Sequence, residues 1–344
     1  MFIAEDLARF KRLFASQLKA MLADDQLGAF ILVLANSLQD EYLKEELAAD
    51  LKNNYEVLKQ AYLAGTLKAP ADDMDVFAQL LEMDIGGLPV WQTRTTGDWE
   101  VTFNTMRQLR PARASKEILN SIIQPFDKNR FHFNKPFLRP EILWQGEHKG
   151  VALRVLYNKF PFAPYHLLIA IMPEDEVPQV LAREQHDYIF SLAAEASQAF
   201  PGFAIGYNSL AAGASVNHLH FQGFIRKQPL AIEEKVREHN GGALDYPLRV
   251  RRFSAPAASW EYIGQLTAQD TAFNCLYRSG NCYVVPRKYQ GAVALPDWLD
   301  GAGWLDVAGG ITVSDRKTFD ALDDQSIARA LGMLKLSVRA SEPV

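Results

Sequence analysis

The chain has 344 residues, 48% of them hydrophobic and 22% charged, which is typical of a globular protein of about two domain-sized units. Its formal net charge of −5 argues against nucleic-acid binding through a broad basic surface. The two cysteines, Cys275 and Cys282, provide no disulfide framework and fit a reducing compartment. Because the N-terminus has no signal-peptide pattern and the apolar stretch 27–38 is too short to span a bilayer, we expect a cytoplasmic protein.

The first 90 residues are expected to form a helical segment. Apolar residues recur at three- and four-residue spacing from Leu7 to Met21, which predicts an amphipathic helix. A helix over 40–63 and a shorter one near 74–83 are expected to follow, and Gly86-Gly87-Leu88-Pro89 ends the helical pattern.

From about Trp91 the pattern changes to strands. We predict strands over 98–104, 151–158, 166–171, 202–208 and 216–225, with a helix from Pro173 to about Phe200. The last two strands should pair as neighbours. This order predicts an α+β fold, a meander with a crossover helix.

Beyond Gln228 the pattern is less regular. We predict a charged helix over 232–239, a hairpin formed by 274–278 and 282–286 around Ser279-Gly280-Asn281, and a final helix over 323–339.

Residues 107–140 form a cation-rich stretch with four prolines. Its only acids are Glu117 and Asp127, against eight basic residues: Arg107, Arg110, Arg113, Lys116, Lys128, Arg130, Lys135 and Arg139. Such charge is consistent with an ordinary solvated loop, and equally with guanidinium groups that screen a polyphosphate.

The most informative motif is the run Asn217-His218-Leu219-His220-Phe221-Gln222. On a strand, His218, His220 and Gln222 would share one face, and the apolar residues between them would enter the core. A single histidine in a strand is most often a satisfied structural residue, but three polar groups in phase need partners or water. Zinc would require more ligands than this pattern offers, so no metal is expected.

Small polar residues precede this strand in Gly206-Tyr207-Asn208-Ser209 and Gly213-Ala214-Ser215. A small-residue loop that leads into a strand with a candidate histidine nucleophile indicates chemistry on a phosphate group.

Together these segments resemble the active-site strand of the histidine triad superfamily, and more narrowly its transferase branch. That branch contains the galactose-1-phosphate uridylyltransferases, the diadenosine tetraphosphate phosphorylases (ATP adenylyltransferases) and the GDP-hexose phosphorylases. Its motif ends in glutamine, as at Gln222, where the hydrolases carry a third histidine. Asn158-Lys159-Phe160-Pro161 with His166-Leu167-Leu168-Ile169 is similar to the dinucleotide phosphorylases, as are 99–107 and 129–144.

The resemblance implies a histidine-triad-like antiparallel sheet with crossover helices, in two related halves. The catalytic half would span 91–230, and 231–344 would be a C-terminal, degenerate second half, indicated by Val284-Val285-Pro286-Arg287. The metal-binding cysteines of the uridylyltransferases are absent, so no structural metal or other cofactor is expected.

The resemblance also implies a mechanism. His220 would attack the α-phosphorus of a nucleotide to give a covalent nucleotidyl-histidine, His218 would shape the site, and Gln222 would donate its amide to a non-bridging oxygen. Further contacts to substrate or phosphate are expected from Asn208, Ser209, Gly213, Ala214, Ser215, Asn158, Lys159 and, by a weaker argument, Arg107.

The expected activity is a phosphorylase-type nucleotidyltransferase that acts on a dinucleoside polyphosphate or a nucleoside-diphosphate sugar with inorganic phosphate. Glutamine has no useful pKa near neutrality, which argues against hydrolysis. A hydrolase of the same fold and a non-catalytic nucleotide-binding protein remain alternatives. We expect no nucleic-acid or membrane partner and consider a homodimer possible.

Overall fold

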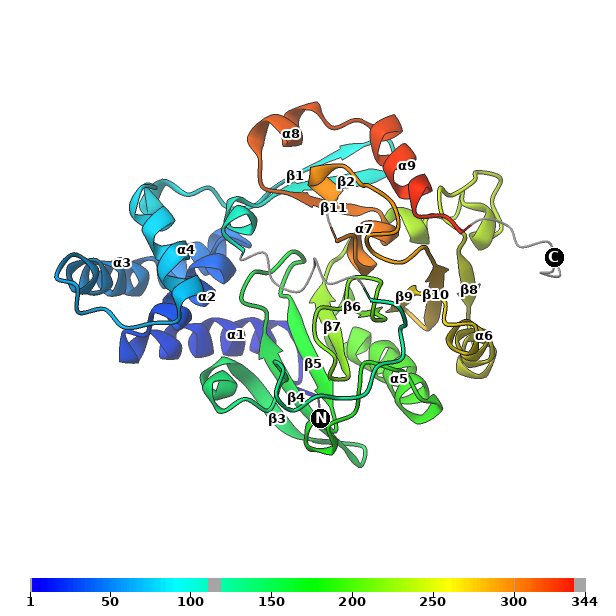
Figure 1. The fold of residues 1–344 in the computed structure, drawn as a ribbon, viewed down its shortest axis with the longest axis horizontal. Helices are drawn as coiled ribbons and strands as arrows, with labels where there is room; N and C mark the ends of the chain where they lie inside the picture. Colours follow the sequence, from blue (N-terminus) through cyan, green and yellow to red (C-terminus); the bar gives the residue numbers. More distant parts are fainter. Residues whose placement is uncertain (1, 111–118, 300, 337–344) are drawn as a thin grey trace.

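The structure is a computed structural model that describes residues 2–110, 119–299 and 301–336 (Figure 1). The helices are α1 (Leu7–Met21), α2 (Leu27–Ser37), α3 (Glu41–Leu63), α4 (Ala71–Leu81), α5 (Arg183–Ala199), α6 (Pro256–Ala268), α7 (Trp304–Ala308), α8 (Arg316–Ala321) and α9 (Asp324–Met333). The strands are β1 (Gln92–Thr96), β2 (Trp99–Phe103), β3 (Ile142–His148), β4 (Val151–Tyr157), β5 (Leu167–Ile171), β6 (Phe203–Asn208), β7 (His220–Ile225), β8 (Arg251–Phe253), β9 (Phe273–Arg278), β10 (Asn281–Pro286) and β11 (Gly310–Val313).

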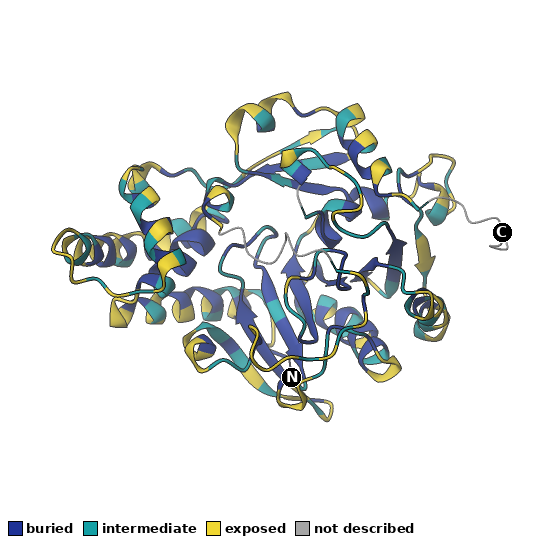
Figure 2. Cartoon of the chain, in the orientation of Figure 1, coloured by how far each residue is buried: buried dark blue, intermediate teal, exposed yellow. Residues whose placement is uncertain are grey.

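The N-terminal helices form a compact module that packs on the main sheet. Asp6 and Asp40 begin α1 and α3 by accepting the backbone N–H groups of Arg9 and Leu43. The apolar residues of α2 are buried on every side because α1, α3 and α4 surround this helix (Figure 2). Every helix among the described residues is too short or too polar to span a lipid bilayer.

In the described part of the chain, eight strands form one antiparallel sheet in the order β3-β4-β5-β7-β6-β9-β10-β8. The predicted pairing of β6 with β7 is confirmed, with Gly206 opposite Gln222. Strand β7 lies between β5 and β6, so α5 must cross over it to connect them. The mixed α+β fold with an antiparallel sheet and N-terminal helices is therefore as the sequence predicted.

The alternation along β7 separates two faces of this sheet. Leu219 and Phe221 enter the larger core, to which α1 and α5 also contribute. His220, Gln222 and Phe224 lie on the opposite face. Two layers cover that face. The segment 119–141 lies over β4 and β5, whereas α7 and a second sheet lie over the end of β7.

This second sheet joins segments that are far apart in the sequence. β1 and β2 form a hairpin, and β11 from the C-terminal region pairs with β2 in parallel (Figure 1). Its apolar side, which includes Trp99, Val101 and Ile311, packs against Trp304 of α7 in one core cluster.

Three predicted helices differ from the structure. Residues 232–239 form two short 3₁₀ turns, Ala231–Glu233 and Glu238–Asn240, because their polar groups bond locally, as His239 and Asn240 do to the Ile232 carbonyl. Helix α5 begins at Arg183 instead of Pro173, since the residues between them contact the β6–β7 region in extended form. The last helix ends at Met333, and residues 337–339 of the predicted helix lie outside the described residues.

Phe14 on α1 tests how strongly the helical module is fixed to the sheet. Its fully buried ring contacts Tyr157 and Tyr165 at centroid distances of 4.7 and 5.1 Å. Phe14→Ala should lower the free energy of unfolding by about 3–5 kcal/mol through lost burial and a residual cavity, measured by urea denaturation. The exposed Val57→Ala is the control, and equal stability of the two variants would contradict a packed interface.

Candidate active site

The side chains of His220 and Gln222 lie side by side on β7, and neighbouring segments hold both of them. The strand begins only at His220, so His218 lies in the chain just before it. The reason is that residues 217–219 form hydrogen bonds to loops and not to a neighbouring strand. Leu219 donates its N–H to the Val177 carbonyl, and Asn217 bonds to the carbonyl groups of 124–125.

The tautomer of His220 is defined by its hydrogen bonds. Nδ1 lies 2.8 Å from the His218 carbonyl and 2.9 Å from Gln179 Oε1, and both of these atoms can only accept. The proton is therefore on Nδ1, and Nε2 keeps its lone pair. Burial is the largest cause that lowers the pKa of His220 to about 4, so the ring is neutral at pH 7.

Gln179 holds this arrangement from the segment that precedes α5. Its Oε1 also accepts the backbone N–H of His220, and its Nε2 donates to the carbonyls of Asn208 and His220. The side chain is 1% exposed. This residue thus connects β6, β7 and the His220 ring, yet no sequence pattern marks it.

His218 is a fully buried structural partner of His220. Its Nδ1 accepts the backbone N–H of Phe133 at 3.1 Å, and its Nε2 donates to the Pro173 carbonyl at 3.0 Å. The segment 119–141 is held in turn by Arg154, which donates to the Phe133 carbonyl and to Asn134. Phe133 also covers the His220 ring at a centroid distance of 4.9 Å.

The amide orientation of Gln222 is likewise fixed. Its Oε1 accepts Trp304 Nε1–H at 2.8 Å and lies 3.0 Å from His166 Nε2. His166 Nδ1 accepts the N–H of Phe162, so its Nε2 carries the proton and donates. With both acceptor positions of Gln222 used, its NH₂ group is the part that can donate to a ligand.

Asn208 and its neighbours form the base of the site. Asn208 Oδ1 accepts Trp304 N–H and Asn274 Nδ2, both at 2.7 Å. The loop with Gly213 comes so close that a Cβ there would lie 3.0 Å from Gly303 Cα, and its φ of +100° also favours glycine. At Gly206, an added Cβ would lie 2.2 Å from the Trp304 ring, so glycine is needed for α7 to seat on β6.

The other residues of the predicted phosphate loop differ in exposure. The Ser209 hydroxyl donates to the Leu210 carbonyl and accepts Phe273 N–H, which joins β6 to β9. Ala214 is buried and Ser215 is exposed. Ser209 is therefore engaged with the backbone, whereas Ser215 is accessible.

Asn158 and Lys159 lie beside β5, next to His166 in the sheet, since Asn158 N–H donates to the His166 carbonyl. Asn158 Oδ1 accepts the N–H of Phe160. Lys159 Nζ forms an ion pair with Asp73 of α4 at 2.6 Å, so its charge is partly neutralised by the N-terminal module.

Cationic groups gather on the Trp304 side of the site. Arg107 donates to the Phe160 carbonyl and lies over the Phe162 ring, and Arg287 is fully buried. Burial lowers the pKa of Arg107 to about 9 and that of Arg287 to about 10, and the charge of Asp306 opposes both shifts. Burial also raises the pKa of Asp306. Two guanidinium groups against one carboxylate leave a positive excess that would suit an anion. Arg113 and Lys116 lie outside the described residues.

The buried His220 ring should stay neutral well below pH 6. Since folded His220 binds fewer protons than the unfolded chain between about pH 4 and 6.5, its contribution to stability is present above 6.5 and decreases as the pH falls through this window. We expect its ¹⁵N spectrum to show protonated Nδ1 and unprotonated Nε2 from pH 8 to pH 5. Assignment comes from His220→Gln, and the urea-unfolded chain is the reference. A midpoint near 6.5 in the folded protein would contradict this prediction.

Part of the chain is similar in sequence to known proteins. Residues 96–224 match the family described as GDPGP1-like, N-terminal domain. Over 129 residues the chain is 36% identical to GDP-D-glucose phosphorylase 1 of Danio rerio, which covers 35% of this chain and 34% of that protein. Over 159 residues it is 31% identical to GDP-L-galactose phosphorylase 2 of Arabidopsis thaliana, which covers 38% and 36%, respectively. The match therefore spans about a third of each relative's length.

The fold is similar to that of yeast Ap4A phosphorylase Apa2 in complex with AMP, with a TM-score of 0.50 and 14% identity over 80% of this chain and 100% of that one. The matched region 96–224 includes His166, Gln179 and β7 up to Phe224, whereas Trp304 lies beyond it. Residues 96–224 are thus similar to the GDPGP1-like N-terminal domain and, at 31–36% identity, to parts of two GDP-hexose phosphorylases.

Proposed function

We propose that this protein is a phosphorylase-type nucleotidyltransferase whose donor is a nucleoside-diphosphate hexose. The observation that carries the proposal is the pair of fixed side chains on β7: a neutral His220 with its lone pair on Nε2, and a Gln222 with its NH₂ group left to donate. The first is a nucleophile and the second stabilises charge on a phosphoryl oxygen.

In the first step, His220 Nε2 attacks the α-phosphorus of the donor. A P–N bond forms, the P–O bond to the second phosphate breaks, and hexose 1-phosphate leaves. In the second step, an oxygen of inorganic phosphate attacks the nucleotidyl-histidine, the P–N bond breaks and a nucleoside diphosphate forms. His220 returns to its neutral form, with the Nδ1 proton held throughout by the His218 carbonyl and Gln179.

The surrounding groups support transfer to phosphate. Gln222 would bond a non-bridging oxygen as negative charge increases in the transition state. Arg107 would offset charge on the leaving phosphate, and Ser215 with the Gly213 and Ala214 amides would cradle the α-phosphate. Asn208 and Ser209 would hold that loop in place, and Asn158 and Lys159 would contact the nucleotide from β5.

Gln222 disfavours a hydrolase because its amide cannot take a proton from water. The sequence relatives are named as phosphorylases of GDP-hexoses, which favours a GDP-hexose as the donor. Because the structural neighbour is an Ap4A phosphorylase, Ap4A is a second donor to test. A homodimer, a cytoplasmic location and the absence of a nucleic-acid partner stay predictions.

The covalent intermediate can be measured by intact-protein mass spectrometry. We expect incubation with GDP-glucose in the absence of phosphate to add one nucleoside monophosphate to the protein, and added phosphate to remove it. Diadenosine tetraphosphate, UDP-glucose and ADP-glucose complete the panel and identify the base. Turnover without phosphate at an equal rate would indicate hydrolysis, and tight nucleotide binding without any adduct would indicate a binding protein.

His220→Ala should abolish adduct formation and reduce turnover on the order of 10⁴-fold or more, because the nucleophile itself is removed. His239→Ala, which removes a histidine whose Nε2 contacts the Ile232 carbonyl in a distant turn, is the control. Near-normal turnover by folded His220→Ala protein would rule out the mechanism.

Trp304 is a positioning residue in this scheme. Trp304→Phe keeps a ring next to Phe224 but removes the N–H donor to Gln222 Oε1, so the amide can rotate. We expect kcat to fall about tenfold, less than the 10²–10³-fold typical of deleting a donor that touches the oxyanion, with little change in KM. Trp260→Phe is the control. An unchanged kcat would show that Trp304 does not orient the amide.

A further inference from the structure

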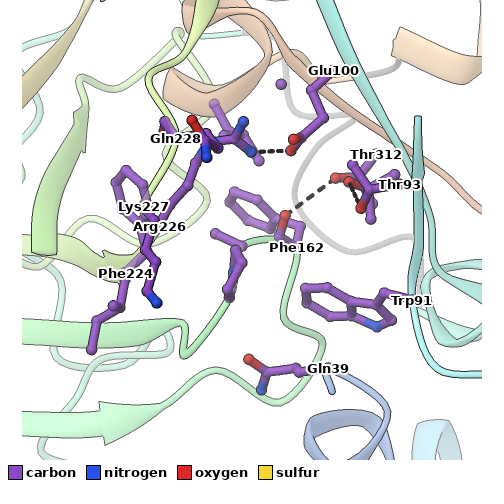
Figure 3. Close-up of a pocket in the computed structure, with 16 residues that line it drawn as sticks. Gln39, Trp91, Thr93, Glu100, Phe162, Phe224, Arg226, Lys227, Gln228 and Thr312 are labelled. Atoms are coloured by element: carbon purple, nitrogen blue, oxygen red, sulfur yellow. Dashed lines mark hydrogen bonds and ion pairs between the residues drawn. The ribbon is translucent and has the colours of Figure 1, made fainter. Parts of the chain in front are cut away.

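A cavity of about 330 Å³ lies outside the catalytic pair, between the small sheet, the loop 162–164 and the end of β7 (Figure 3). We call it the Trp91 pocket. Its lining includes three threonines and three aromatic residues: Thr93, Thr102, Thr312, Trp91, Phe162 and Phe224.

Three hydroxyl groups form a row across the pocket. Thr93 of β1 is opposite Thr102 of β2, and Thr102 is opposite Thr312 of β11, so all three line the same face of the small sheet. The oxygens of Thr93 and Thr102 are 3.3 Å apart, and Thr312 donates to the Phe162 carbonyl at 3.2 Å. Hydroxyls donate or accept by rotation, which suits the hydroxyl groups of a sugar.

Aromatic rings form the other walls. Trp91 from the segment before β1, Phe162 from the loop 162–164 and Phe224 from β7 all line the cavity (Figure 3). The C–H faces of a hexose pack on aromatic rings while its hydroxyls reach polar neighbours. A nucleobase needs a fixed donor–acceptor edge instead, and the Gln39 amide is already committed to Asn36 and to Tyr165 N–H.

The rim of the pocket carries a positive excess. Glu100 is ion-paired with Arg226, and Lys227 is exposed beside them. Two cations and one carboxylate give a net charge of +1 among these three residues. A phosphate group on the ligand would find a counter-ion there.

The pocket shares its walls with the groups that hold Gln222. Phe162 packs edge-on against His166 at a centroid distance of 4.3 Å, and Phe224 stacks on Trp304 at 4.5 Å. Phe224 is two residues beyond Gln222 on the same strand face, or about 7 Å along β7. A ligand in the pocket would therefore contact the rings that pack against His166 and Trp304, the two donors to Gln222 Oε1.

We propose that the Trp91 pocket binds the hexose of a sugar phosphate. This inference rests on the proposed function, because hexose 1-phosphate is part of the donor and is the first product released. The sugar has two possible sources: the hexose of the bound donor, or a free sugar phosphate that occupies the pocket independently.

The test is equilibrium binding of glucose 1-phosphate by calorimetry to the wild type, Trp91→Ala and the nearly isosteric Thr102→Val. Trp260→Ala, in which a half-buried tryptophan of α6 is removed, is the matched control. We expect the Kd to rise at least tenfold in Trp91→Ala and at least threefold in Thr102→Val, and to be unchanged in Trp260→Ala. Equal affinity in all folded variants would overturn the proposal.

Kinetics separate the two sources. If the donor's hexose occupies the pocket, Trp91→Ala raises the KM for GDP-glucose and leaves the KM for diadenosine tetraphosphate unchanged. If a free sugar phosphate binds, glucose 1-phosphate alters the rate with diadenosine tetraphosphate in the wild type but not in Trp91→Ala. If neither of these two kinetic effects is observed, the assignment of the pocket to a hexose is overturned. If the wild-type protein forms no nucleotide adduct, the proposed function is refuted. Calorimetry with glucose 1-phosphate still tests sugar phosphate binding in the Trp91 pocket in that case.

Discussion

The arrangement of the site depends on one acceptor atom, Gln222 Oε1, which receives N–H donors from His166 and Trp304. A free glutamine amide can present either its oxygen or its NH₂ group to a phosphate, and only NH₂ attracts the anion. Two donors on the oxygen remove that choice before substrate arrives. Because the three side chains are buried, where an unmet hydrogen bond is costly, the orientation is held firmly.

The same logic applies to the proposed nucleophile, His220. His220 has its proton fixed on Nδ1 by acceptors from two different segments, and burial keeps its pKa low. A neutral ring with one available lone pair needs no base to activate it. The side chains of His220 and Gln222 are thus oriented by neutral hydrogen bonds, and on the Trp304 side Arg107 and Arg287 both lie in the field of the single carboxylate of Asp306.

The fold brings these donors together from distant parts of the chain. β7 lies in the sheet between β5 and β6, which places His166 beside Gln222. The pairing of β11 with β2 and the absence of a side chain at Gly206 allow Trp304 to pack next to Gln222. The Trp91 pocket adjoins this assembly through Phe162 and Phe224. A ligand that displaced those rings would disturb the hydrogen bonds from His166 and Trp304 to Gln222.

The sequence by itself determined the local features. Alternation along 218–222 distinguished the polar positions from the core positions Leu219 and Phe221, and periodicity located the N-terminal helices, because both depend on near neighbours in the chain. The helix predicted over 232–239 was wrong because local side-chain bonds to the Ile232 carbonyl favour tight turns. The division into 1–90, 91–230 and 231–344, and the two related halves, stay predictions. Only the tertiary structure decided which residues hold the catalytic pair: Gln179 comes from an irregular segment, and Trp304 lies 82 residues beyond Gln222. Contacts at such separations leave no periodic pattern, so they exist only once the sheets have packed.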